Sequence, residues 1–340
     1  AIMLSEIKIE EAFSLLWPII DVRSPAEFEH GHIPGAINIP LFSNDERAHV
    51  GTVYKQQSKE RAIKIGLEYV TPKLESFINN SQKIAPLGKV TVHCWRGGMR
   101  SSSFAQHLIE SGFNDVRVII GGYKAYRSHV LNKLATPINL KVLGGYTGSG
   151  KTHILNELKK RGKQVLDLEG LANHKGSAFG GIGQAIQPTV EQFENNLFNE
   201  WKKLNLHEPI WVEDESHNIG RAKIPMQFFK QMRDAKLYFI DIPKNERAKH
   251  LVTEYASCNS QLLAESIQNI SKRLGGLNVK NSIELLENEN YYEVAKISLS
   301  YYDKSYLKGM NNRNSEDVIK IPLPSTNHYE NALEIEKQLI

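Results

Sequence analysis

Residues 140–152 read Leu-Lys-Val-Leu-Gly-Gly-Tyr-Thr-Gly-Ser-Gly-Lys-Thr, and this stretch decides the fold class. Its apolar beginning, Leu140 to Leu143, is typical of a buried strand, and the pattern from Lys151 to Arg161 predicts a helix. Between them, Gly145 to Thr152 match a phosphate-binding loop, in which four residues separate a glycine from Gly-Lys-Thr. A loop of this kind between a strand and a helix predicts an α/β domain that binds phosphate groups.

The loop residues have distinct tasks in such a site. Glycines allow backbone N–H groups to wrap around a phosphate, the lysine neutralises its charge, and the threonine hydroxyl can hold Mg²⁺. The candidate phosphate-binding residues are Gly145, Gly148, Ser149, Gly150, Lys151 and Thr152. The motif predicts that a di- or triphosphate binds, but the sequence offers no residue assignable to orienting water for its hydrolysis.

Polar residues follow two later strands. The apolar run Ile210–Val212 is followed by Glu213 and Asp214. Either acid is a candidate for the carboxylate that faces the metal ion of a phosphate loop. An exposed acidic strand end explains the two residues equally well. Two loops follow predicted strands, where α/β folds place ligand contacts, although plain connecting loops explain them as well. Their candidate substrate-contacting residues are His174, Lys175, Ser177, Ser216 and Arg221.

The same alternation of strands and helices precedes the phosphate loop, which predicts a second parallel sheet with helices on both faces. Thr136-Pro137 marks the boundary, so we expect domains over residues 1–135 and 136–340. The expected strands are Ile19–Val22, Val90–His93, Val116–Ile120, Leu140–Leu143, Val165–Leu168, Ile210–Val212 and Leu237–Ile240. Helical patterns cover 59–78, 101–110 and most of 245–300, and the last twenty residues suggest an outer strand and helix.

One loop in the first domain carries a reactive residue type. It reads Cys94-Trp-Arg-Gly-Gly-Met-Arg100 and lies between a predicted buried strand and a helix. Glycine amides and a helix N-terminus form an anion cradle, and Arg100 can fork onto a bound anion. These features lower the pKa of a thiol and favour a thiolate nucleophile, so Cys94, Arg96 and Arg100 are the candidate catalytic residues. An inert buried cysteine is the alternative.

Motifs before and after this loop resemble the rhodanese fold. They are Asp21-Val-Arg-Ser-Pro-Ala-Glu-Phe28, then Gly31-His-Ile-Pro-Gly-Ala-Ile-Asn-Ile-Pro40, and Gly121-Gly122-Tyr123. The resemblance implies a chalcogen carrier that holds sulfur or selenium on Cys94 as a persulfide or perselenide. His93-Cys94-x5-Arg100-Ser101 is also similar to the signature of cysteine phosphatases, and this loop is one residue longer than is usual in sulfur-transferring rhodaneses. The longer loop suits a tetrahedral, phosphate-like anion, so the loop alone leaves a selenophosphate donor and a phosphoester both open.

The order of the two domains, with Leu171–Gly180 and Glu215–Gly220 between later strands, resembles the bacterial tRNA 2-selenouridine synthases. That resemblance implies an enzyme that acts on a wobble uridine in the anticodon loop of tRNA. Its 2-thio group would first be alkylated by geranyl diphosphate, and selenium from selenophosphate would then displace the geranyl thiol. No tightly bound cofactor is implied, and Mg²⁺ is an option at the phosphate loop.

Composition narrows the remaining alternatives. The chain has 340 residues with a formal net charge of +4 and two cysteines, Cys94 and Cys258. This excludes a disulfide scaffold and a cysteine-based zinc site. No signal peptide or apolar run long enough to span a bilayer is evident, so we expect a cytoplasmic protein that does not engage a membrane. Cys258 lacks a motif and is interpreted as structural.

Three other functions compete with selenium transfer. They are a rhodanese-fold phosphatase, an ATP-dependent kinase or motor, and an RNA-binding module without catalysis. RNA contact is suggested by Lys55, Lys59, Arg61 and Lys64, by Lys272, Arg273 and Lys280, and by Tyr291, Tyr292, Tyr301, Tyr302 and Tyr306 among Lys296, Lys304 and Lys308. Solvated lysines and tyrosines packed in a core are the favoured interpretation of these groups.

Overall fold

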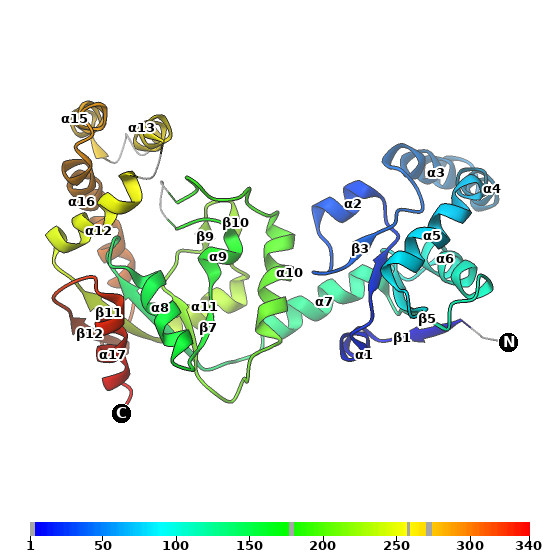
Figure 1. Cartoon of the computed structure of the whole chain (residues 1–340), viewed down its shortest axis with the longest axis horizontal. Helices are drawn as coiled ribbons and strands as arrows, with labels where there is room; N and C mark the ends of the chain where they lie inside the picture. Colours follow the sequence, from blue (N-terminus) through cyan, green and yellow to red (C-terminus); the bar gives the residue numbers. More distant parts are fainter. Residues whose placement is uncertain (1–3, 177–179, 257–258, 270–273) are drawn as a thin grey trace. The chain divides into compact units, whose positions relative to one another are not determined.

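The structure is a computed structural model that describes residues 4–176, 180–256, 259–269 and 274–340. The chain divides into two compact units, residues 1–133 and 134–340, and each has its own parallel sheet (Figure 1). Along the described residues, no helix is both long enough and apolar enough to cross a bilayer. Ser177, Cys258, Lys272 and Arg273, which the sequence singled out, lie outside the described residues.

In the first unit, the sheet has the strand order β1-β5-β4-β2-β3 and every pairing is parallel. The strands are β1 (Ser5–Ile7), β2 (Ile19–Asp21), β3 (Ile37–Asn38), β4 (Lys89–His93) and β5 (Asp115–Ile119). The helices are α1 (Ile9–Leu15), α2 (Pro25–His30), α3 (Asn44–Gln56), α4 (Lys59–Val70), the 3₁₀ turn η1 (Thr71–Lys73), α5 (Leu74–Ile84), α6 (Met99–Glu110) and α7 (Gly122–Leu134). This arrangement confirms the predicted parallel α/β domain.

The predicted helix over residues 59–78 is divided into two. Helix α4 ends at Val70, η1 contains Pro72, and α5 begins at Leu74. A proline ring clashes with the preceding helical turn and lacks an N–H donor, so a straight helix cannot continue through it. The apolar spacing persists across the break because Phe77 still packs into the core of this unit.

In the second unit, the sheet has the order β12-β11-β6-β8-β7 and its pairings are again parallel. The strands are β6 (Leu140–Gly145), β7 (Gln164–Leu166), β8 (Ile210–Glu213), β11 (Lys236–Asp241) and β12 (Val318–Pro322), with a separate hairpin of β9 (Asn218–Ile219) and β10 (Ala222–Lys223). The helices are α8 (Lys151–Lys160), α9 (Leu168–Ala172), α10 (Val190–Trp201), α11 (Met226–Asp234), α12 (Lys244–Ala256), α13 (Ser260–Asn269), α15 (Gly276–Glu287), α16 (Tyr291–Met310) and α17 (His328–Lys337), with the 3₁₀ turn η2 (Ser315–Asp317).

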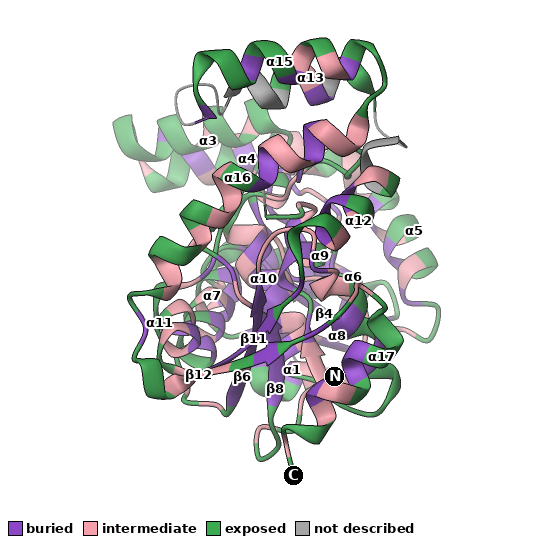
Figure 2. Ribbon diagram, turned by 90° about the vertical axis from the view of Figure 1, so that its left-hand side faces the viewer, coloured by how far each residue is buried: buried purple, intermediate pink, exposed green. Residues whose placement is uncertain are grey.

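Helices cover both faces of this second sheet. On one face, apolar residues of β6, β8, β11 and β12 pack with those of α8 and α17, for example Leu143 with Ile154 and Ile335. Because side chains alternate along a strand, the neighbouring residues face the other side, where Phe239 stacks on Tyr306 of α16. Strands β6, β8 and β11 are accordingly buried for most of their length (Figure 2). The expected outer strand near the C-terminus is β12, which pairs only with β11 among the described strands.

The predicted strand Val165–Leu168 is too long by its last two residues. Strand β7 ends at Leu166, and Leu168 is the first residue of α9. Asp167 caps this helix by accepting a hydrogen bond from the backbone N–H of Gly170 at 3.0 Å. An aspartate at this position satisfies an unpaired amide of the first helical turn, which ends the strand and redirects the chain.

Candidate functional site

The loop between β4 and α6 encloses the sulfur of Cys94. This cysteine is a free thiol with only 3% of the residue exposed. Ser101 Oγ lies 3.1 Å from Sγ, and the backbone N–H groups of Gly98 and Ser101 donate to the sulfur. Burial alone raises the pKa of the thiol, but these hydrogen bonds and the charge of Arg100 outweigh it and lower the pKa below its ordinary value. The loop therefore favours a thiolate, as the sequence predicts.

The Gly121-Gly122 segment holds this loop in place. The N–H of Tyr123 donates to the carbonyl of Cys94 at 2.9 Å. Gly122 has a φ of +58°, and a Cβ atom there would lie 2.5 Å from the Cys94 carbonyl oxygen and 2.7 Å from the Gly97 nitrogen. A side chain at this position would push the loop off its support, which gives the Gly-Gly-Tyr motif a physical role.

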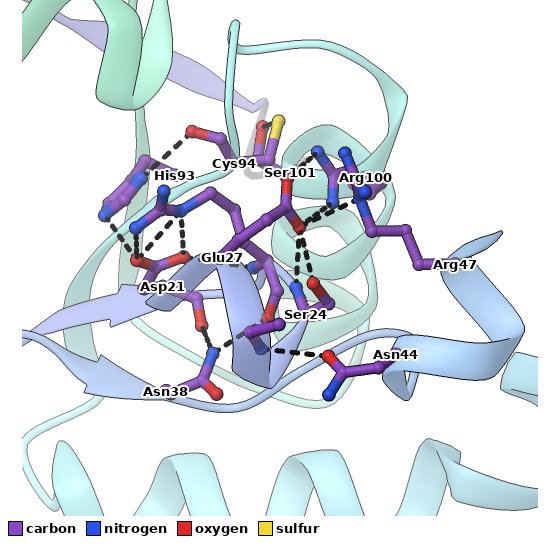
Figure 3. A network of polar contacts seen from close by, with 12 residues as sticks. Asp21, Ser24, Glu27, Asn38, Asn44, Arg47, His93, Cys94, Arg100 and Ser101 are labelled. Carbon is purple, nitrogen blue, oxygen red and sulfur yellow. Dashed lines mark hydrogen bonds and ion pairs between the residues drawn. The ribbon is translucent and has the colours of Figure 1, made fainter. Parts of the chain in front are cut away.

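Arg100 is held by a carboxylate next to the sulfur (Figure 3). Its two Nη atoms donate to Glu27, at 3.0 and 3.4 Å. Glu27 also pairs with Arg47 at 3.1 Å and accepts hydrogen bonds from Ser24. Burial raises the pKa of Glu27, but the hydrogen bonds and charge of Arg100 more than offset it, so the carboxylate is ionised. Arg96 is exposed and makes no hydrogen bond or ion pair with a described residue.

A buried ion pair lies beneath the loop. Asp21 at the end of β2 accepts hydrogen bonds from Arg23, the shortest at 2.7 Å, and Arg23 lies 3.9 Å above the ring of Tyr123. His93 donates from Nδ1 to the Cys94 carbonyl at 3.0 Å, and burial lowers its pKa, so the imidazole is neutral near pH 7. Burial raises the pKa of Asp21, but His93 and the hydrogen bonds and charge of Arg23 outweigh burial and lower the pKa below its ordinary value. Arg23 is therefore the cation of this pair at neutral pH.

The phosphate loop lies at the carboxyl end of β6. Lys151 Nζ donates to the carbonyl of Gly145 at 2.8 Å and lies 3.8 Å from Glu213 Oε1. The hydroxyl of Thr152 lies 3.4 Å from carboxylate oxygens of both Glu169 and Glu213. Gly148 and Gly150 have φ values of +81° and +74°, so the loop backbone needs glycine at both positions.

Three carboxylates converge beside Thr152. The ligand oxygens of Glu169, Glu213 and Glu215 lie within 4.8 Å of one another. Burial raises the pKa of Glu213, and the nearby charge of Glu169 raises it further against the effect of Lys151. Burial and the interaction with Glu169 likewise raise the pKa of Glu215. Such a cluster of oxygens either shares protons or holds a cation.

Glu213 and Asp214, the two candidate metal-side acids, have different surroundings. Glu213 faces Thr152, as described above. Asp214 accepts hydrogen bonds from Tyr306 Oη at 2.8 Å and from Arg313 at 3.0 Å. Asp214 also borders the cavity, but both its oxygens are engaged by the helical part of the unit. The geometry therefore favours Glu213 and gives Asp214 a role in anchoring α16.

A cavity of about 720 Å³ opens over the phosphate loop. Among the predicted substrate-loop residues, His174, Lys175 and Ser216 line it, whereas Arg221 is exposed and lies outside its lining. Glu215 and His217 also line it and belong to the loop that the sequence singled out. The sequence did not single out four other lining residues, namely Asp167, Glu169, Arg233 and His250. Asp167 and Glu169 directly follow β7, so their place at the carboxyl edge of a parallel sheet was a usable signal.

The tyrosines that suggested RNA contact have different surroundings in the structure. Tyr291, Tyr292 and Tyr301 pack against the helical core of the second unit, and Tyr306 is bonded to Asp214. Lys55, Lys59, Arg61 and Lys64 are exposed on α3 and α4. The interpretation as core residues therefore suits Tyr291, Tyr292 and Tyr301, whereas Tyr302 and Tyr306 line the cavity over the phosphate loop.

Removing the Ser101 hydroxyl tests the electrostatics of the thiol. In a Ser101→Ala variant, we expect the pKa of Cys94 to rise because one donor to the thiolate is lost. The rate of alkylation by iodoacetamide, followed against pH in the full chain, should then reach half its maximum at a higher pH than in the wild type. Ser103→Ala, an exposed change on the same helix, is the control. An unchanged profile for Ser101→Ala would contradict this account.

Breaking the buried ion pair tests the support of the loop. We expect Asp21→Ala to lower the free energy of unfolding by about 3–5 kcal/mol, because it leaves the Arg23 guanidinium buried without its partner. Since folding lowers the pKa of Asp21, its contribution is present above the ordinary carboxyl pKa and is lost as the pH falls through the folded value. The free energy of unfolding is measured by urea titration followed by circular dichroism, and Asp45→Ala, an exposed change, is the control. If both variants lost the same free energy of unfolding, the buried ion pair would not be what supports the loop.

Comparisons with known proteins cover both units. Residues 138–330 match the family model of the tRNA 2-selenouridine synthase AAA domain, and residues 6–129 match the rhodanese-like domain. Proteins named tRNA 2-selenouridine synthase from Nitrosomonas eutropha and Bdellovibrio bacteriovorus are each 34% identical. The matches cover 89% of this chain and 91% of the first relative, and 92% and 94% for the second.

A solved structure also matches part of the chain. It is the N-terminal domain of a putative ATP/GTP binding protein from Clostridium difficile 630, which is 44% identical. The match covers 37% of this chain and 99% of that one, with a TM-score of 0.35.

Proposed function

The chain belongs to the tRNA 2-selenouridine synthase family, and from this premise we propose that it replaces the 2-thio sulfur of a wobble uridine in tRNA by selenium. The observation that carries the proposal is the pairing, on one chain, of a thiolate-favouring cysteine loop and a phosphate-loop cavity. The first suits chalcogen transfer and the second suits a diphosphate substrate.

In the first proposed step, the phosphate loop binds geranyl diphosphate. The thiocarbonyl sulfur of the base attacks C1 of the geranyl chain, the C1–O bond breaks, and its electron pair leaves with the diphosphate. Lys151 and the loop amides stabilise the charge that develops on the departing oxygen. Alkylation makes the sulfur a better leaving group for the next step.

In the second proposed step, selenium from selenophosphate passes through Sγ of Cys94 to C2 of the base. Sγ attacks selenium, and the Se–P bond breaks with its electron pair leaving on phosphorus as phosphite, so that a perselenide forms on Cys94. The terminal selenium then attacks C2, the C2–S bond breaks, and geranyl thiol leaves. A small-molecule thiol cleaves the remaining S–Se bond, which releases 2-selenouridine and leaves a mixed disulfide on Cys94 that a second thiol reduces. A thiolate at neutral pH suits this role because thiolates are the reactive form of cysteine. The amides of Gly98 and Ser101 stabilise the negative charge at Sγ whenever the thiol is free.

A divalent cation fits the carboxylate cluster. Hard oxygen ligands are what Mg²⁺ prefers, and Thr152, Glu169, Glu213 and Glu215 supply them within a small space. When bound, such an ion would neutralise charge on the diphosphate. Its binding would also release the protons that these carboxyl groups otherwise share.

The alternative of a phosphatase on the rhodanese fold has a weaker basis. Such an enzyme needs a carboxylic acid to protonate the leaving group. Glu27, which lies at Arg100, is held ionised by that arginine, and ionised carboxylates cannot donate a proton.

Binding of the tRNA anticodon loop is part of the proposal. Lys55, Lys59, Arg61 and Lys64 are exposed on two neighbouring helices, α3 and α4, and exposed basic residues attract phosphates in a salt-dependent way.

Nucleoside analysis tests the proposed function. Thiolated tRNA, geranyl diphosphate, selenophosphate and a small-molecule thiol are incubated with the full chain, and the digested nucleosides are analysed by mass spectrometry. We expect S-geranyl-2-thiouridine and then 2-selenouridine. Absence of both, together with Cys94-dependent hydrolysis of an aryl phosphate, would instead support the phosphatase.

A further inference from the structure

The ring of His174 lies in a slot bordered by glycines. A Cβ atom on Gly180 would lie 2.7 Å from Nδ1 of the ring, and one on Gly220 would lie 2.7 Å from Cδ2. Both distances are too short for a real contact, so neither position accepts a side chain while the ring is there. A backbone hydrogen bond ties Gly180 to the residue after His174, because the N–H of Lys175 donates to the carbonyl of Gly180 at 2.8 Å. The imidazole is therefore fixed in position.

The hydrogen bond at Nδ1 determines which ring nitrogen carries the proton. The N–H of Gly176 donates to Nδ1 of His174 at 3.0 Å, so Nδ1 is an acceptor and the proton of the neutral ring is on Nε2. Nε2 makes no hydrogen bond with any described residue. The ring thus carries a neutral N–H at Nε2, and His174 is one of the residues that line the cavity.

We propose that His174 is a catalytic residue for the prenyl transfer, with its Nε2–H donating a hydrogen bond to the diphosphate as it leaves. The inference rests on the proposed function and deepens it at the same cavity. When the base sulfur attacks C1, negative charge accumulates on the diphosphate oxygens. A donor that is already oriented stabilises this charge without reorganisation, and no proton needs to be transferred. Lys151 supplies the charge and His174 supplies a directed neutral donor.

Two substitutions separate this role from a structural one. His174→Asn keeps an oxygen acceptor for the Gly176 N–H but has no donor at the position of Nε2. His174→Gln places an amide N–H near that position. We expect His174→Asn to lower kcat for S-geranylation by roughly 10- to 150-fold, the range for one hydrogen bond to a charged group, with KM for tRNA and the melting temperature unchanged. His174→Gln should recover part of the loss, and exposed His207→Asn should match the wild type.

Binding of inorganic diphosphate, measured by calorimetry, gives a readout independent of turnover. It should weaken in His174→Asn and be largely kept in His174→Gln. Equal kcat and equal diphosphate binding in wild type and His174→Asn would overturn the inference while leaving the proposed function intact. An equal loss in Asn and Gln variants with a lowered melting temperature would also overturn it, in favour of a structural role. If the wild type forms no geranylated product, the proposed function fails. The binding of inorganic diphosphate by the wild type and the two variants then shows by itself whether His174 contacts the diphosphate.

Discussion

A Cys94→Ser variant is expected to lose at least roughly a thousandfold in 2-selenouridine formation, while S-geranylation of the tRNA continues. Serine is nearly the same size, but its hydroxyl is not ionised at neutral pH and cannot carry selenium. Geranylated tRNA should therefore accumulate in the variant when all substrates are present, as measured by nucleoside mass analysis.

The matched control is Cys258→Ser, which changes the other cysteine of the sequence and should leave selenation near the wild-type rate. The loop that carries Cys94 packs against Gly122, and its Cys94 carbonyl accepts hydrogen bonds from the Tyr123 N–H and from His93 Nδ1. None of these contacts uses the sulfur, so Cys94→Ser should keep the melting temperature of the wild type. Selenation by Cys94→Ser at the wild-type rate would show that selenium reaches the base by a route without this thiol.

A Lys151→Ala variant is expected to show the opposite pattern. Geranylation should fall by roughly 100- to 1000-fold, the cost of removing one preorganised group that stabilises a developing anion. The lysine ammonium contacts the loop carbonyl of Gly145 and lies near Glu213, so its removal takes the cation away from the phosphate site. The measurement is the rate of S-geranyl-2-thiouridine formation at saturating geranyl diphosphate.

Lys159→Ala on the same helix is exposed and serves as the control. If tRNA that is already S-geranylated is supplied, the Lys151→Ala variant should still form 2-selenouridine, because Cys94 lies in the other unit. Geranylation at the wild-type rate in Lys151→Ala would reject the phosphate loop as the diphosphate site.

The fold class could be predicted because buried parallel strands are short apolar runs with turn residues after them. Val90–His93 and Leu237–Ile240 lie within β4 and β11. Helix α3 gives no such signal, because Val53 is its one buried residue and most of its surface is polar. Its start is instead marked by the Ser43–Glu46 capping box.

The site was predictable where its residues are neighbours in sequence. The cysteine loop and the phosphate loop each occupy a few consecutive positions, so their chemistry can be inferred from spacing. The carboxylate cluster joins Glu169 after β7 with Glu213, the last residue of β8, and Glu215, which follows that strand. Only the strand order shows that these strand ends are adjacent. The role of His174 likewise depends on Gly220, which is far away in the sequence.

Passage of selenium through the thiolate of Cys94 can be observed on the protein itself. The full chain is incubated with selenophosphate without tRNA, alkylated rapidly under non-reducing conditions, digested, and analysed by mass spectrometry. We expect the peptide containing Cys94 to gain the mass of one selenium atom, and we expect Ser101→Ala to reduce the fraction of Cys94 that carries selenium. A Cys94 peptide without selenium, under conditions in which the same preparation forms 2-selenouridine, would contradict the account.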